Sequence, residues 1–152
     1  MPLIDHALQY VSRHWFIFPL KPRSKQPLIS KAQGGRGFHD ATTDPKQIEV
    51  WWGQCPDANI GLATGASGLV VLDADGPEGL AELDALARQH GALPRTLVSK
   101  TGRGFHFFFS GTGIPSSQVK GSHLDVRGST GYVVLPPSVH PSGAAYEWMR
   151  YQ

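Results

Sequence analysis

Residues 70–76, VVLDADG, place two carboxylates at the end of an apolar segment. Side chains two positions apart on a strand point to the same face, so Asp73 and Asp75 share a face with Leu69 and Val71. The two acids lie roughly 6–7 Å apart at Cα, since each residue advances a strand by about 3.3 Å. Carboxylates this close repel each other unless a cation neutralises them. The segment therefore fits either a divalent-cation site or a strand that ends at Asp73 and is followed by an Asp-Gly turn.

The chain has 152 residues, a length that suits a single domain, 1–152, with a hydrophobic core. Its one cysteine, Cys55, allows neither an internal disulfide nor a multi-cysteine zinc site. The sequence shows no signal peptide and no apolar run long enough to span a bilayer, so we expect a cytoplasmic protein with no membrane partner. The abrupt end after the strand-like segment YEWMRYQ leads us to expect an N-terminal fragment of a longer protein.

The spacing of apolar residues predicts helices interspersed with antiparallel strands, which indicates an α+β fold. Helices are expected at residues 3–14, 45–54 and 77–91, with a long loop at 21–42. Strands are expected at residues 15–20, 59–65, 68–75, 96–100, 105–110, 124–127, 132–136 and 146–152. A tight Gly/Ser turn separates the strands at 59–65 and 68–75, which favours a hairpin.

Side-chain periodicity also predicts which faces are buried. In the strand 105–110, we expect Phe105, Phe107 and Phe109 to face the core, with His106 on the opposite face. In the helix 77–91, the leucines expected on the buried side are Leu80, Leu83 and Leu86.

Acidic and basic residues are segregated along the chain. Nine of the twelve acids lie between Asp40 and Asp84, whereas residues 6–39 and 85–124 contain basic residues and no acid. Solvated surface lysines and arginines would account for the two basic segments. A surface that binds a polyanion beside a metal site is the alternative, which charge alone does not favour.

His106 follows a Gly-x-Gly turn in the segment TGRGFHFFFS, residues 101–110. Exposed backbone N–H groups in such turns form anion-binding concavities. Together with Lys100 and Arg103 from the same region, His106 suits a triphosphate. The chain contains no GxxxxGK[ST] motif, so this turn is not a Walker A loop.

A third acid, Asp125, falls on the expected strand 124–127, with Arg127 two residues later on the same face. A plain Asp–Arg surface bridge would explain this pair taken alone. Three acids from two strands, together with a histidine and arginines, describe a site for metal-assisted phosphoryl or nucleotidyl transfer. In such sites two metal ions stabilise the attacking and leaving oxygens.

Six segments in this order resemble the bifunctional DNA primase/polymerase N-terminal domain, the prim-pol branch of the archaeo-eukaryotic primase superfamily. The resemblance covers nearly the whole chain, and the order of the segments makes it specific. The segments are FPLKPRSKQP (18–27), ATTDPKQIEVWW (41–52), PDANIGLATG (56–65), VVLDADG (70–76), TGRGFHFFF (101–109) and LDVRGSTGYVVLPPSVHPSG (124–143), the last followed by Tyr146.

The resemblance implies a catalytic domain with an RRM-like mixed or antiparallel sheet that acts as a DNA primase and DNA polymerase by template-directed nucleotidyl transfer. The family's acidic motifs fall on Asp73, Asp75 and Asp125, and the resemblance implies that these residues bind two Mg²⁺ or Mn²⁺ ions. Its histidine motif falls on His106, which is implied to contact the phosphates of the incoming nucleotide. Its DVRG pattern places Arg127 near the same nucleotide. The zinc-binding stem of some plasmid-encoded relatives has no counterpart here, so zinc is not expected.

The sequence leads us to expect further binding residues and partners. The other residues expected to bind nucleotide are Arg103, Lys100 and Ser99. Those expected to contact the template or primer backbone are Lys25, Lys31 and Arg36. The expected partners are nucleoside triphosphates, a single-stranded DNA template with its primer, and a C-terminal helicase domain in the full-length chain.

Two other functions stay open on the sequence. One is a non-catalytic RRM-like module that binds single-stranded nucleic acid by stacking bases on Phe and Trp. Converging acids argue against it, because they would repel the phosphate backbone. The other is a metal-dependent nuclease, which a requirement for triphosphates and the release of pyrophosphate would separate from a polymerase.

Overall fold

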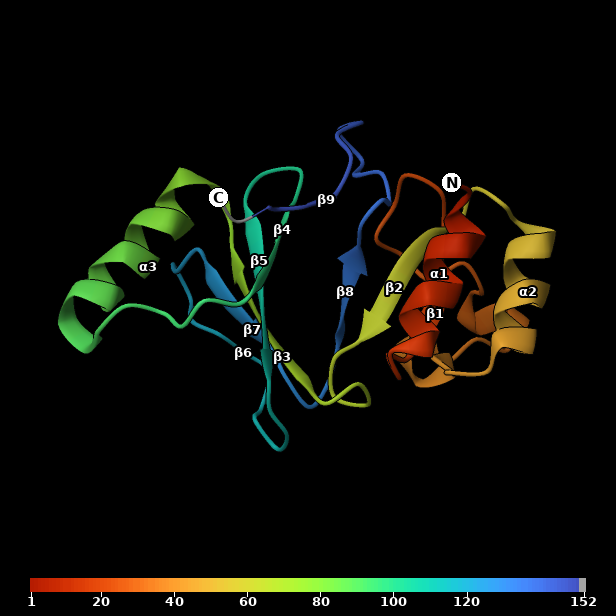
Figure 1. Cartoon of the computed structure of the whole chain (residues 1–152), viewed down its shortest axis with the longest axis horizontal. Coiled ribbons are helices and arrows are strands. Elements are labelled where there is room, and N and C mark those ends of the chain that lie inside the picture. The colour runs from red at the N-terminus through yellow and green to blue at the C-terminus, as the bar shows by residue number, and fades with distance from the viewer. Residues whose placement is uncertain (151–152) are drawn as a thin grey trace.

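The computed structural model describes residues 1–150, which form an α+β fold of antiparallel sheets flanked by helices, as predicted (Figure 1). The α-helices are α1 (Leu3–Ser12), α2 (Pro45–Gln54) and α3 (Gly76–His90). Two short 3-10 helices, η1 (Lys31–Gln33) and η2 (Gly37–Asp40), interrupt the segment expected to be a loop. The strands are β1 (Ile17–Leu20), β2 (Asn59–Ala63), β3 (Leu69–Ala74), β4 (Leu97–Lys100), β5 (Phe105–Ser110), β6 (Ser117–Gln118), β7 (Leu124–Arg127), β8 (Tyr132–Leu135) and β9 (Glu147–Trp148).

The strands fall into two sheets rather than one. The smaller sheet has the order β1-β2-β8 and the larger has the order β6-β7-β3-β5-β4-β9. Every pairing between named strands is antiparallel in the part of the chain described here. The last strand ends at Trp148, and the final two residues of the strand expected at 146–152 lie outside the described residues.

The smaller sheet is buried on both faces, because every residue of β1 and β2 is buried. Helices α1 and α2 pack together beside this sheet, and the larger sheet lies on its other side (Figure 1). Asp44 caps α2 by accepting a hydrogen bond from the backbone N–H of Lys46 at 3.0 Å. The same helix buries Trp51 and Trp52 in the core.

The hairpin predicted for residues 59–65 and 68–75 is wrong. Strand β2 pairs with β1 and β8, whereas β3 pairs with β5 and β7 in the other sheet. The backbone N–H of Leu69 donates to the carbonyl of Thr64 at 3.0 Å, so the turn does form, but the strands separate beyond it. Both segments are rich in apolar residues, so each can pair with distant strands, and a local pattern cannot choose between partners.

The buried face of β5 is also the opposite of the predicted one. Phe108 is 3% exposed and belongs to the core, and His106 on the same face is 7% exposed. Phe105, Phe107 and Phe109 lie half-buried on the outer face of the larger sheet. The reason is the second sheet, which covers the His106 face and makes it the inner one.

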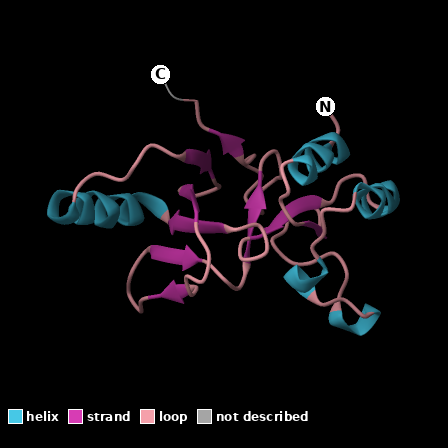
Figure 2. Ribbon diagram, turned by 60° about the horizontal axis from the view of Figure 1, so that its bottom comes forward, coloured by secondary structure: helices cyan, strands magenta, loops and turns pink. Residues whose placement is uncertain are grey.

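Helix α3 does not bury its leucines as predicted. Leu80 and Leu86 are 37% and 44% exposed, and Leu83 is half-buried. In Figure 2 this helix extends away from the strands on the side opposite α1 and α2. None of the helices within residues 1–150 is long and apolar enough to cross a membrane.

Candidate active site

The acids and the histidine singled out in the sequence meet in one row across the larger sheet. Asp73 on β3 lies opposite His106 on β5 and opposite Asp125 on β7. His106 in turn lies opposite Ser99 on β4. Residues directly opposite in antiparallel strands point to the same face, so these four side chains share the inner face of the sheet. Four strands, β3, β4, β5 and β7, thus supply this row.

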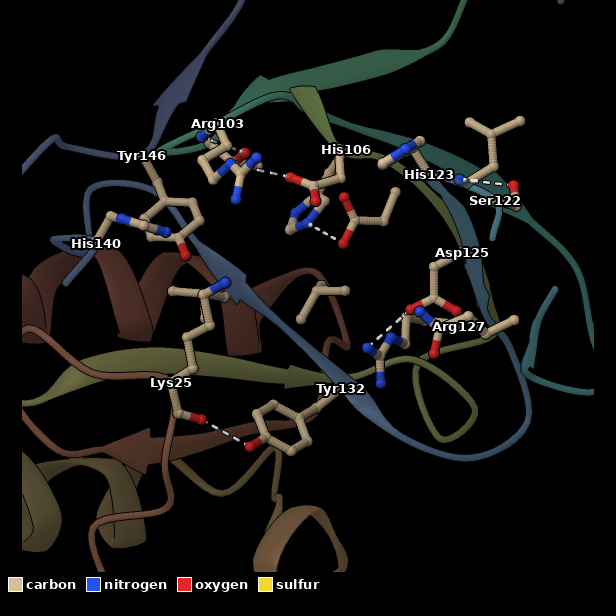
Figure 3. Close-up of a pocket in the computed structure, with 17 residues that line it drawn as sticks. Lys25, Arg103, His106, Ser122, His123, Asp125, Arg127, Tyr132, His140 and Tyr146 are labelled. Carbon is tan, nitrogen blue, oxygen red and sulfur yellow. Dashed lines mark hydrogen bonds and ion pairs between the residues drawn. The ribbon is translucent and has the colours of Figure 1, made fainter. Parts of the chain in front are cut away.

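This row lies along a pocket of about 410 Å³, between the larger sheet, β8 and two loops (Figure 3). The pocket is strongly polar and carries both acidic and basic side chains. Its lining residues are Lys25, Asp73, Asp75, Thr101, Arg103, His106, Gln118, Ser122, His123, Leu124, Asp125, Arg127, Tyr132, Val133, Val134, His140 and Tyr146.

Asp73 lies at the centre of the row, and its side chain is 30% exposed. Its Oδ2 is 3.5 Å from Nε2 of His106. Burial by itself would raise the pKa of Asp73, but contact with His106 and the charges of Lys25 and Arg127 outweigh it and hold that pKa below its usual value. The carboxylate is therefore ionised at neutral pH and can bind a cation.

Asp75 lies just beyond β3, at the position that precedes the first residue of α3. Its backbone N–H donates to the carbonyl of His123 at 2.9 Å, and the next N–H, that of Gly76, donates to the carbonyl of Arg103 at 3.1 Å. These bonds fix the neighbouring loops on either side of Asp75. The Asp75 carboxylate then lies 3.6 Å from Nε of Arg103.

The turn that carries Arg103 fits here only because Gly104 has no side chain. A Cβ at Gly104 would lie 1.9 Å from the carbonyl oxygen of Ala74, and a Cβ at Gly102 would lie 2.3 Å from the ring of His140. The Gly-x-Gly pattern therefore serves close packing against β3 and His140, in addition to the anion-binding role considered from the sequence.

Asp125 and Arg127 form an ion pair, with Nη2 of Arg127 2.8 Å from Oδ2 of Asp125. Both lie on β7 and point into the pocket, where the Asp125 side chain is 16% exposed. The surface bridge considered from the sequence is therefore present, but inside the pocket, beside Asp73.

Carboxylate oxygens are the donors that Mg²⁺ and Mn²⁺ prefer, so the acids of this pocket fit such ions by their chemistry. In the structure, however, each acid has a basic partner: Asp73 has His106, Asp75 has Arg103 and Asp125 has Arg127. Within residues 1–150, no three side chains of the metal-binding types are gathered closely enough to share an ion. Binding a metal would require these carboxylates to turn from their basic partners.

Two atoms in this row are buried without a hydrogen-bond partner among the described residues, Nδ1 of His106 and Oγ of Ser99. Ser99 is fully buried and does not line the pocket, so it lies beneath the site. An orphaned polar atom in a native fold calls for a partner such as water or a ligand. The two unpaired atoms therefore favour a functional role for this row.

The remaining predicted site residues lie elsewhere. Lys100 is exposed and, one residue after Ser99, points to the outer face of the sheet, away from the pocket. Lys31 and Arg36 are exposed on the segment around η1 and η2, also outside the pocket. Lys25, also expected to contact nucleic acid, is the exception and lines the pocket.

Sequence reasoning missed His140 and Tyr146, which form a wall of the pocket next to His106. The Tyr146 ring lies 6.4 Å from that of His106 and 5.9 Å from that of His140. Burial, with a smaller effect of Asp73, raises the pKa of Tyr146 to about 12, so its hydroxyl stays protonated. A histidine between Val139 and Pro141 in an irregular loop was the available signal, because loop residues carry function more often than core residues.

A comparison with protein families gives one match. The family model described as Prim-Pol, bifunctional DNA primase/polymerase, N-terminal, matches residues 7–152. No curated protein matches the chain significantly. The matched stretch contains all strands of both sheets and all three acids of the pocket.

Proposed function

Because the chain belongs to the Prim-Pol family of bifunctional DNA primase/polymerase N-terminal domains, we propose that this pocket carries out template-directed nucleotidyl transfer. The observation that supports this proposal best is the row in which Asp73 faces both Asp125 and His106. An acid pair and a histidine on one polar pocket floor suit a reaction at a phosphate. The family match supports a DNA primase/polymerase function for this chain. The roles of individual residues are our proposals.

Asp73, Asp75 and Asp125 would hold two Mg²⁺ or Mn²⁺ ions. When bound, such ions activate the attacking hydroxyl and stabilise the leaving pyrophosphate. The protein contributes the lowered pKa of Asp73, which keeps this carboxylate ionised at neutral pH. It also contributes Arg103 and Arg127, which neutralise Asp75 and Asp125 until a cation takes their place.

In the proposed reaction, the primer 3′-oxygen forms a bond to the α-phosphorus of the triphosphate while the bond to pyrophosphate breaks. His106, Arg103 and Arg127 line the pocket where charge then builds on the phosphates. The exposed Lys31 and Arg36 are proposed to contact the template or primer backbone outside the pocket. A single-stranded DNA template, its primer and a helicase domain in a longer chain are the proposed partners.

Asp73→Asn tests the proposal, because it keeps the shape of the side chain and removes its charge. We expect primer extension with dNTPs or NTPs, in Mg²⁺ or Mn²⁺, to fall by at least about 100-fold, the scale for loss of one charge-stabilising group. The matched control is Asp84→Asn, which removes an exposed carboxylate on α3 whose ion-pair partner among residues 1–150 is Arg88. Extension by a folded Asp73→Asn variant at the wild-type rate would contradict the proposal.

The same assay separates the alternatives. A nuclease would shorten the primer and release no pyrophosphate, and a binding module would retain DNA without any metal-dependent turnover. The structure offers the binding module little support, because the three outer phenylalanines of β5 are half-buried rather than exposed.

A further inference from the structure

Two loops outside the larger sheet form the wall of the pocket that faces the acids. One precedes η1 and carries Lys25, and the other follows β8 and carries His140 (Figure 3). They are more than 100 residues apart in sequence, so something must hold them together. Both loops adjoin the first residue of β2, Asn59.

Asn59 bonds directly to both loops through its side-chain amide. Its Nδ2 donates to the carbonyl of Ser24 at 3.0 Å and to the carbonyl of Val139 at 2.8 Å. Its Oδ1 accepts from the backbone N–H of Val139 at 3.0 Å. The residue is 2% exposed and does not line the pocket. Each bonded loop residue immediately precedes a pocket residue, so the amide fixes the backbone beside Lys25 and His140.

The hydrogen bonds of His140 define its protonation. The backbone N–H of Ser142 donates to Nδ1 at 3.0 Å, so Nδ1 is an acceptor and the ring proton lies on Nε2. Burial, together with the charges of Lys25 and Arg103, lowers the pKa of His140 and favours this neutral form. Nε2 is then the remaining hydrogen-bond donor of the ring.

Lys25 supplies a positive charge on the same wall. Its charge influences both Asp73 and His140, so it lies within electrostatic range of both sides of the pocket. The Lys25 carbonyl also accepts a hydrogen bond from the hydroxyl of Tyr132 at 2.6 Å, which holds this loop against β8. Because Lys25 and His140 line the same pocket as the acids, this wall is accessible to the remaining phosphates of a ligand whose reacting phosphate lies at the acids.

We propose that Asn59 is a positioning residue that sets Lys25 and His140 as a pair for the terminal phosphates of the bound nucleoside triphosphate. The proposal rests on the nucleotidyl-transfer function above and refines it. It also assigns Lys25 to the nucleotide rather than to the template backbone.

The test measures binding of a nucleoside triphosphate and of the matching monophosphate to the whole chain with primer–template and Mg²⁺ or Mn²⁺. Lys25→Ala should weaken triphosphate binding about tenfold, as expected for a hydrogen bond to a charged group, and leave monophosphate binding unchanged. Asn59→Leu should act in the same direction. The double variant, Lys25→Ala with Asn59→Leu, should bind the triphosphate no more weakly than the single variant with the lower affinity. The reason is that both changes remove the same interaction.

Ile48→Ala is the control for stability, because Ile48 is fully buried in α2 and lies outside the pocket. It should lower the melting temperature and leave triphosphate affinity unchanged. Should Asn59→Leu not fold, Asn59→Asp keeps the acceptor for Val139 and removes both donors. If neither Asn59 variant folds, the test is the double variant Lys25→Ala with His140→Ala. If the two residues act as a pair, its loss of triphosphate affinity should be smaller than the sum of the losses in the two single variants.

Additive effects of the Asn59 and Lys25 variants, or equal losses for the monophosphate, would overturn the proposal. So would a loss of triphosphate affinity in Ile48→Ala, or a loss of primer–template affinity in place of triphosphate affinity in Lys25→Ala. Wild-type protein that binds no triphosphate would instead refute the nucleotidyl-transfer function itself. Normal wild-type binding with no effect of Lys25→Ala would refute only the role of this pair.

Discussion

Asp73 and His140 line the same pocket, and burial by itself shifts their pKa values in opposite directions. Desolvation disfavours the charged form of any group, so it raises the pKa of an acid and lowers that of a histidine. At Asp73 the neighbouring His106 and basic charges reverse the effect of burial, whereas at His140 the neighbouring Lys25 and Arg103 reinforce it. One pocket therefore keeps its central acid ionised and its wall histidine neutral at neutral pH.

Gly104 gives a prediction at the scale of one residue. A Cβ there would lie 1.9 Å from the carbonyl oxygen of Ala74, so Gly104→Ala forces β3 and the turn before β5 apart. We expect a loss of at least about 2 kcal/mol in the free energy of unfolding, within the range for steric conflicts in packed regions. Urea denaturation measures it.

Gly53→Ala is the matched control, because a Cβ at Gly53 in α2 would meet no atom within 4 Å. Alanine is the better helix former, so this change should stabilise the protein by up to about 1 kcal/mol. Equal stability changes in the two variants would show that the close approach at Gly104 is not what the structure indicates.

The sequence predicted the site residues on strands better than the pocket residues on loops. Period-two spacing correctly put Asp73 on a face that begins with the core residue Val71 and ends in the pocket. It could not place Lys25 or His140, because loops have no period. Their positions depend on the Asn59 amide, a contact that no local pattern encodes.

Among the elements, α3 is anchored at one end only. Glu82 accepts hydrogen bonds from the Ser122 hydroxyl at 2.6 Å and from the His123 N–H at 2.7 Å. Beyond this point Leu86 is 44% exposed, and the only buried residues of α3 are Gly76 and Gly79, near its start. The helix therefore leaves its C-terminal half with little packing to stabilise it.

We expect the amides of α3 after Glu82 to exchange with deuterium faster than those of α2, after correction for intrinsic rates. Segments with few buried apolar contacts open at lower free energy than segments packed in the core. Helix α2 is the internal reference, because its Ile48 and Trp52 are 0% and 1% exposed. Equal protection in the two helices would indicate that α3 is held by contacts beyond those described.

The errors in assigning elements share one physical cause. Local patterns correctly predicted where α1, α2 and β5 lie, but the partner of β2 and the inner face of β5 depend on a second sheet. Phe108 faces inward because Trp15 stacks on it at 6.2 Å from the other layer. Alternation shows that a strand has two faces, and only the tertiary arrangement decides which of them is covered.

At the scale of the molecule, aromatic side chains join the two layers. Tyr10 of α1 stacks on Trp15 at 5.5 Å, and Trp15 lies against both Phe108 of β5 and Trp148 of β9. These rings place the helical layer and the larger sheet around one core. The acid row begins directly beside this core, since His106 is two residues from Phe108 on the same face of β5. Core packing therefore supports the floor of the pocket.

The Tyr10 hydroxyl adds a polar connection between these layers. It donates to the carbonyl of Pro136 at 2.5 Å, just beyond β8, and accepts from Nε1 of Trp148 at 2.9 Å. Burial raises the pKa of Tyr10 to about 12, so the hydroxyl remains a donor at any physiological pH. Strand β9 pairs only with β4 among the described strands, so the bond to Trp148 is one of few that hold it.

Tyr10→Phe should therefore destabilise the whole fold while leaving the ring packing in place. It leaves the Pro136 carbonyl and the Trp148 N–H without their partner, which costs about 1–3 kcal/mol for a buried polar group. Urea unfolding followed by tryptophan fluorescence measures this loss. Tyr132→Phe is the control, because it also removes one hydroxyl but breaks an exposed bond to Lys25. We expect it to cost clearly less, since water can replace an exposed partner. If the two variants lost equal stability, the Tyr10 hydroxyl would have no special part in joining the layers, and aromatic packing together with the pairing to β4 would hold β9 in place.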